Sequence, residues 1–235
     1  MSEASAALWE VFHRRTGGLG GRPAVSSSAG ELSFEELWKE ADRLAVHFAG
    51  AGVPESAVVG LALPNSPRFL AAFLALCRLN ATVALLSPQY RPGELSAIVA
   101  GVGTACVVAE KASASAVSEA VPIARSSTAD GLDVLFPSAE SSAASAALLK
   151  FSSGSTAEPK GIALSASNVL AEVENVTQTL GLGEGDRIHA GVPLFHSYGF
   201  DLGVLPTVYA GSTLVLEDVF VPRRTLSTLD SSVPA

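Results

Sequence analysis

The sequence predicts an α/β protein whose largely parallel sheets are covered by helices. Short apolar runs of strand length alternate with longer segments in which apolar residues recur at helical spacing. The strand candidates are apolar at consecutive positions, as in parallel sheets that are buried on both faces. The composition agrees, because 48% of the 235 residues are hydrophobic and 16% are charged, which is typical of a protein with a large buried core.

Helix and strand signals follow one another along the first half of the chain. Ser33 and Glu36 have the spacing of a capping box, which predicts the start of a helix. Apolar residues then recur at helical spacing as far as Phe48, and Gly50 and Gly52 end the helix. The further elements expected in this half are strands at 58–63, 82–86 and 104–109 and helices at 66–79 and 92–100.

Changes in amino-acid composition along the sequence predict two subdomains joined by a connection. Residues 1–110 are expected to form a first α/β subdomain, and residues 111–146 an Ala/Ser-rich connection with little to pack. One apolar piece, Asp133–Phe136, is expected to dock in the middle of that connection. Residues 147–235 would form a partial second α/β subdomain. Its expected elements are a strand ending near Leu149, an amphipathic helix from about Ser165 to Gly181, and strands around 188–193 and 213–216.

Charge, cysteines and apolar runs exclude several classes of protein. A formal net charge of −8 argues against a nucleic-acid partner, which demands basic patches. Cys77 and Cys106 lie in apolar stretches without a Cys-x-x-Cys pair, so we expect no disulfide and no metal-ligating residues, and a reducing, cytoplasmic location. The longest apolar run, Phe69–Cys77, is far shorter than the roughly 20 residues of a membrane-spanning helix. No signal-peptide pattern opens the sequence.

The most informative segment is Phe151-Ser152-Ser153-Gly154-Ser155-Thr156-Ala157-Glu158-Pro159-Lys160-Gly161. A hydroxyl- and glycine-rich turn that leaves a strand, followed by one lysine, can wrap phosphate oxygens with backbone N–H groups and a cation. It is not a Walker loop, because Pro159 precedes Lys160 and Gly161 follows it, where that motif has glycine and Ser/Thr. We therefore predict binding of a nucleoside triphosphate. The residues expected to contact it are Ser152, Ser153, Gly154, Ser155, Thr156, Lys160 and Gly161.

This loop resembles the phosphate-binding signature of the adenylate-forming superfamily, which includes acyl-CoA synthetases and the adenylation domains of peptide synthetases. It departs from the family pattern at Ala157, where relatives usually have glycine, and Ser165-Ala166 replaces a common Ser-His. Three other segments resemble the family in the same order along the chain. They are Leu32–Leu37, Asn80–Leu95, and the aromatic–His segment Val192-Pro193-Leu194-Phe195-His196-Ser197-Tyr198-Gly199-Phe200.

The resemblance implies a fold, a reaction and a site. The fold would be the incomplete N-terminal domain of the adenylate-forming enzymes, with two Rossmann-like subdomains. The reaction would be ATP- and Mg²⁺-dependent activation of a fatty or other carboxylic acid as an acyl-adenylate, followed by transfer to the thiol of CoA or of an acyl or peptidyl carrier protein. Lys160 and His196 would be catalytic. Phe195, His196, Tyr198 and Gly199 would border the acid substrate.

Other interpretations remain open beside this one. The family's later motifs do not follow before Ala235, so we expect either the N-terminal portion of a longer ligase or a truncated, inactive module that binds nucleotide or acyl groups. A serine hydrolase is disfavoured because no Gly-x-Ser-x-Gly elbow is present. An uncovered sheet edge would favour self-association. The residues interpreted as structural are the histidines His13, His47 and His189, the core aromatics Trp9, Trp38 and Phe73, and the surface or turn acids Asp186 and Asp201.

Overall fold

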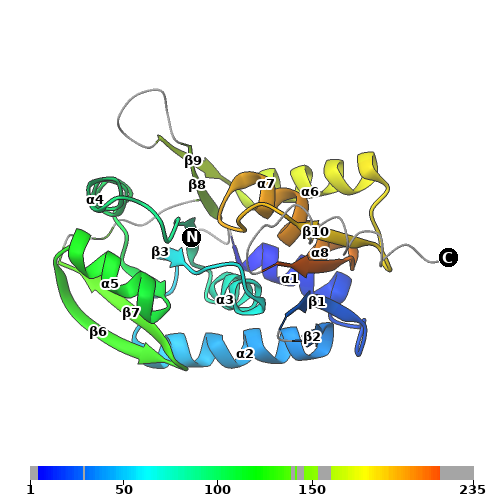
Figure 1. Cartoon of the computed structure of the whole chain (residues 1–235), viewed down its shortest axis with the longest axis horizontal. Helices are drawn as coiled ribbons and strands as arrows, with labels where there is room; N and C mark the ends of the chain where they lie inside the picture. The colour runs from blue at the N-terminus through cyan, green and yellow to red at the C-terminus, as the bar shows by residue number, and fades with distance from the viewer. Residues whose placement is uncertain (1–4, 29, 139–140, 142–145, 153–159, 218–235) are drawn as a thin grey trace.

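The protein folds into two β-sheets that are packed with helices (Figure 1). The computed structural model describes residues 5–28, 30–138, 141, 146–152 and 160–217. Within these ranges the architecture is mixed α/β, as the sequence predicts. No described helix is both long enough and apolar enough to cross a membrane.

The larger sheet has seven strands in the order β6-β7-β5-β3-β4-β8-β9. Its four central strands, β5, β3, β4 and β8, are parallel, whereas β6, β7 and β9 run antiparallel to their neighbours. Every residue of β3, β4 and β5 is buried, which explains their uninterrupted apolar sequences. The bounds are β3 Val58–Ala62, β4 Thr82–Leu85, β5 Cys106–Ala109, β6 Ile123–Ala129, β7 Leu132–Pro137, β8 Leu148–Ser152 and β9 Lys160–Leu164.

The smaller sheet joins the beginning of the chain to its later part. Its order is β10-β11-β1-β2, with β10, β11 and β1 parallel and β2 antiparallel to β1. The expected strands near 188–193 and 213–216 are β10 and β11, whereas β1 and β2 were not predicted. The bounds are β1 Pro23–Ser27, β2 Gly30–Ser33, β10 Arg187–Ala190 and β11 Thr213–Leu216.

The helices fill the space between the sheets and cover the outer face of the larger one. Helix α3 packs against β1 of one sheet and β3 and β4 of the other, and Figure 1 shows it between them. Residues Phe69–Cys77 of this helix are all fully buried. Apolar residues of α4 and α5 cover the other face of the larger sheet. The bounds are α1 Ala6–Thr16, α2 Phe34–Ala51, α3 Pro67–Arg78, α4 Pro92–Gly101, α5 Lys111–Ala120, α6 Ala166–Leu180, α7 Ser197–Gly199, the π-helix η1 Phe200–Val204 and α8 Leu205–Ala210.

Local signals set the ends of the helices where the sequence predicts them. The Ser33 side chain accepts from the Glu36 N–H at the start of α2, and the Glu36 carboxylate accepts from the Ser33 N–H. Gly52 ends this helix in the left-handed conformation, with φ of 90°. Ser165 caps α6 in the same way, with Asn168 as the third residue of the helix.

The expected Ala/Ser-rich connection contains more regular structure than its composition suggested, because residues 111–137 form α5, β6 and β7. Small residues do not prevent a helix if one face can be buried, and Ala114 and Val117 bury that face of α5. The apolar piece Asp133–Phe136 docks as part of β7, which pairs with β5. Residues 139–140 and 142–145 of the expected connection lie outside the described residues. The boundaries of the two subdomains remain a prediction, and β8 joins β4 of the first in one sheet.

Candidate functional site

The expected phosphate loop follows strand β8 directly. Its residues Ser153, Gly154, Ser155 and Thr156 lie outside the described residues. The two ends of the loop are described, because Ser152 ends β8, Lys160 begins β9, and the two residues are register partners in an antiparallel pair. Strands β8 and β9 are therefore an antiparallel pair at the edge of the larger sheet (Figure 1).

Lys160 and Gly161 occupy the strand that leaves this loop. Lys160 is exposed, and within the described part of the chain it has no ion-pair partner. A solvated ammonium group next to a hydroxyl-rich loop suits an anionic ligand. Gly161 has a steric role, because a Cβ atom there would come within 3.2 Å of the Phe151 ring on the paired strand.

The aromatic–His segment forms a sharp turn into a helical stretch. His196 lies just before α7 and is exposed, and its Nδ1 accepts from the Tyr198 N–H at 3.4 Å. Phe195 is half-buried against the main core. Gly199 lies so close to the chain that a Cβ atom there would be 2.2 Å from the Pro193 carbonyl oxygen. The turn can therefore close only with glycine at this position.

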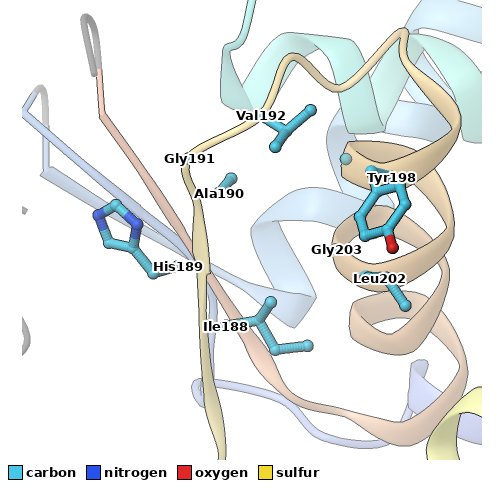
Figure 2. Close-up of a pocket in the computed structure, with 9 residues that line it drawn as sticks. Ile188, His189, Ala190, Gly191, Val192, Tyr198, Leu202 and Gly203 are labelled. Carbon is cyan, nitrogen blue, oxygen red and sulfur yellow. The ribbon is translucent and has the colours of Figure 1, made fainter.

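A cavity of about 170 Å³ lies between β10 with the residues after it and the helical stretch that follows His196. Two of the expected substrate-pocket residues, Tyr198 and Gly199, line it, whereas Phe195 and His196 are not among its lining residues. Figure 2 shows Ile188 and Val192 on one wall, opposite Tyr198 and Leu202. The complete lining is Ile188, His189, Ala190, Gly191, Val192, Tyr198, Gly199, Leu202 and Gly203.

The side chain of His189 projects from the opposite side of β10, away from this cavity (Figure 2). It lies 3.0 Å from the Glu217 carboxylate, and both side chains are nearly buried. Its interpretation as a structural histidine fits this placement.

Three ionisable side chains meet beside the predicted site. The Lys150 ammonium group on β8 lies 2.5 Å from an oxygen of Asp201 in η1 and 3.1 Å from an oxygen of Glu172 in α6. The side chains of Lys150 and Asp201 are only 7% and 12% exposed. The expectation of a surface or turn acid at Asp201 is therefore wrong, because this residue is buried within the π-helix η1. Burial raises the pKa of Asp201 to about 6, although Lys150 donates to the carboxylate and favours its charged form. Asp186 is a turn acid as expected, accepting from the Gly183 N–H.

Lys150 lies outside the motifs from which the site was predicted, although the sequence contains a signal for it. A lysine inside the otherwise apolar run Ala147–Phe151 is unusual, because buried lysines need a partner. Such a lysine predicts an acidic side chain elsewhere in the chain. The sequence alone does not identify that acid, which lies 51 residues away at Asp201.

The mixed α/β fold and the hydroxyl-rich sequence that follows β8 describe the chain only as an α/β protein. Comparisons with known proteins identify the family to which it belongs. A profile of the family described as AMP-binding enzyme matches residues 12–231. The chain is 31% identical over 225 residues to 4-coumarate–CoA ligase 5 of Oryza sativa subsp. japonica, across 88% of the chain and 42% of that relative. The chain therefore belongs to the AMP-binding enzyme family and spans less than half the length of this relative.

Solved structures support the same fold. A long-chain-fatty-acid-CoA ligase from Archaeoglobus fulgidus superimposes with a TM-score of 0.79 at 21% identity, over 98% of this chain and 50% of that one. ATP-bound MatB from Rhodopseudomonas palustris gives a TM-score of 0.78 at 19% identity, over 94% of this chain and 48% of that one. The chain has the fold of the N-terminal part of the adenylate-forming enzymes.

Proposed function

We propose that this chain supplies the N-terminal part of an AMP-forming acid–thiol ligase, which activates a fatty or other carboxylic acid as an acyl-adenylate. The acyl group then passes to the thiol of CoA or of a carrier protein. Membership of the AMP-binding enzyme family supports the general reaction class. The acid and the acceptor belong to the proposal.

The observation that carries the proposal is the contact between Lys150 and Asp201. Lys150 lies three residues before Ser153, where the expected phosphate loop begins, and Asp201 lies five residues after His196. The 2.5 Å distance between their charged atoms joins a side chain of β8 to one of η1. The strand that leads into the segment expected to bind phosphate is therefore linked to the helical stretch that follows His196.

The proposed roles follow from the chemistry of carboxylate activation. A carboxylate oxygen attacks the α-phosphorus of ATP, the bond to the bridging oxygen breaks, and pyrophosphate leaves with the electron pair. Such a displacement requires neutralisation of charge and in-line positioning. Lys160 would neutralise charge on the phosphates. Gly154 and Gly161 would allow the backbone to approach the nucleotide closely. Further hydrogen-bond donors would be the hydroxyls and N–H groups of Ser152, Ser153, Ser155 and Thr156.

The acid would occupy the cavity beside β10. Tyr198 and Gly199 line that cavity, and His196 and Phe195 precede them in the same turn. His196 is exposed, so its ring can donate to or accept from the carboxylate or the entering thiol. These four residues form the proposed substrate side of the site.

Mg²⁺ would accompany the nucleotide and neutralise charge on its phosphates. Among the described residues no group of three or more His, Cys, Asp or Glu side chains could hold a metal ion. In this proposal the phosphate oxygens of ATP are ligands of Mg²⁺, and the exposed Lys160 is the protein cation beside them.

The test is acid-dependent exchange of labelled pyrophosphate into ATP, over carboxylic acids of increasing chain length, with ATP affinity measured by equilibrium dialysis. We expect Lys160→Ala to lower exchange and ATP affinity roughly 10- to 100-fold, because it removes one charge-assisted contact to phosphate. The matched control is Lys39→Ala, which removes another exposed lysine, on α2, that pairs with Glu35.

Each outcome has a distinct meaning. Exchange that requires a particular acid and falls only in Lys160→Ala supports an activating module. ATP binding without exchange favours the alternative function, a catalytically inactive module that binds nucleotide or acyl groups. Wild-type affinity for ATP in Lys160→Ala contradicts the proposed role of this lysine.

A further inference from the structure

The charged cluster of Lys150, Asp201 and Glu172 joins three elements that are far apart in the sequence. Lys150 comes from the middle of β8, Glu172 from α6 and Asp201 from η1. Glu172 is 36% exposed at its side chain and remains partly hydrated, whereas the other two side chains are nearly buried. The core of the cluster is therefore a single buried ion pair between a strand and a helical turn.

Burying an ion pair between two elements carries a large desolvation cost. Removing two charges from water costs more than apolar packing of the same volume, and replacement of such pairs by apolar residues is often neutral or stabilising. Stability alone therefore does not account for Lys150 in an otherwise apolar strand. The pair instead fixes one direction and one distance between β8 and η1, because a charge-assisted hydrogen bond is directional and apolar contact is not.

The turn that carries Asp201 uses each of its faces for a different contact. Phe200 packs edge-on against Phe73, with ring centroids 5.0 Å apart, in the space between the sheets. Tyr198 and Leu202 face the cavity beside β10 (Figure 2). Asp201 faces β8 through Lys150. The ion pair therefore opposes any rotation of the turn that would move Leu202 and Tyr198 relative to β8.

We propose that Lys150 and Asp201 are positioning residues that hold the strand leading into the phosphate loop against the turn that follows His196. This inference rests on the proposed function. In this role the two residues act by keeping β8 and η1 at a fixed separation. Without the pair, Leu148 of β8 and Phe200 of η1 remain in the same apolar core, but the two elements lose this fixed geometry.

The experiment compares ATP affinity with resistance to urea in the full 235-residue chain. The variant Lys150→Met/Asp201→Asn removes both charges and keeps similar side-chain volumes. We expect it to unfold at a urea concentration equal to or above that of the wild type, yet to bind ATP roughly fivefold or more weakly in equilibrium dialysis. The control Glu172→Gln changes only the partly exposed member and should stay within about twofold of the wild type.

A structural role alone would change the urea midpoint and leave the ATP affinity of the folded protein unaltered. The inference is overturned if the double variant is folded and binds ATP as the wild type does. If the double variant does not fold, Asp201→Ala serves in its place, because it removes the acceptor while Lys150 keeps Glu172 as a partner, and wild-type affinity in that variant has the same meaning. Failure of the wild type to bind ATP would instead contradict the proposed function.

Discussion

Gly199 is a residue of the predicted site at which the backbone is closely packed. Its φ is −67°, which any residue can adopt, so the demand for glycine is steric and not conformational. A Cβ atom there would lie 2.2 Å from the Pro193 carbonyl oxygen and 2.8 Å from that of Val192. Both neighbours are backbone atoms, so only a shift of the chain can relieve the clash.

We therefore expect Gly199→Ala to destabilise the protein by about 1–3 kcal/mol, the usual cost of overpacking a closed site. Gly203→Ala is the matched control in η1, because its Cβ atom would meet only the Leu214 side chain, at 3.1 Å. Alanine also favours helix there by up to about 1 kcal/mol, so Gly203→Ala should be near neutral. Urea unfolding of both variants checks this difference, and equal losses would contradict it.

The neighbouring sequence predicts the burial of some residues but not of others. Cys77 and Cys106 lie within apolar runs, and both are buried as expected. Asp201 has no such context, because its burial depends on a lysine that precedes it by 51 positions. The cavity beside β10 presents the same difficulty. The motif predicts Tyr198 and Gly199, whereas Ile188 and Ala190, which precede the motif, reach the cavity only because β10 lies opposite the turn.

At the scale of elements, the β6–β7 hairpin is the largest departure from the sequence prediction. Its turn is formed by Asp130 and Gly131, with φ of 53° and 74°, and an Asp-Gly turn of this kind is a strong hairpin signal. The Ala/Ser-rich composition around this turn favoured the prediction of a connection instead of a hairpin. The hairpin is tied to the helices, because Asp130 accepts from Arg43 of α2 and Arg68 of α3.

This anchor predicts a dependence of stability on pH. Hydrogen bonding from Arg43, with a further contribution from Arg68, lowers the pKa of Asp130 to about 2. A carboxyl group whose pKa is lowered by folding contributes stability above the pKa of the unfolded chain, near 4, and loses it as the pH falls towards 2. Because both arginines are partly exposed, the contribution is about 1 kcal/mol or less.

The variant that isolates this charge is Asp130→Asn, since asparagine also tolerates the left-handed conformation. We expect it to be less stable than the wild type at pH 7 and to approach the wild type at pH 3 and below, as measured by urea unfolding. Asp42→Asn is the control, because Asp42 pairs with Arg78 on the surface with 52% of its side chain exposed. A difference between Asp130→Asn and wild type that is constant with pH would contradict the assignment.

The elements that the sequence predicts well are those with long local patterns. Helices α2, α3 and α6 carry helical periodicity together with a capping serine, and each begins within a residue or two of its predicted start. Strands β1 and β2 have no comparable pattern, because they are short and only partly buried. They form by pairing with each other and with β11, about 190 positions further along the chain, which local propensity does not reveal.

At the scale of the whole molecule, the two sheets share one core around α3. Buried residues from both sheets and from helices α1, α2, α3, α6 and α8 belong to a single apolar cluster. Strand β1, near the start of the chain, pairs with β11, so the early and late segments are tied together. Unfolding of the described part of the chain should therefore be cooperative.

The exposed end of the larger sheet predicts the behaviour of the molecule in solution. Strand β9 is the last strand of the seven and presents one edge without a neighbouring strand among the described residues. Ile162 in this strand is 51% exposed. An unprotected edge with an apolar side chain is a template for pairing with another chain, so we expect association that increases with protein concentration.

A single charge on β9 should suppress this association. Lysine protects the edges of natural sheets, because pairing of two chains would bury its ammonium group. We expect Ile162→Lys to shift the sedimentation velocity distribution towards the monomer at high protein concentration. The free energy of unfolding, measured with urea, should change by no more than about 0.5 kcal/mol. Val46→Lys is the matched control, because Val46 is 64% exposed and lies on helix α2, not on a strand. A wild-type protein that sediments as a monomer at all concentrations, or an equal effect of both lysines, would contradict pairing through β9.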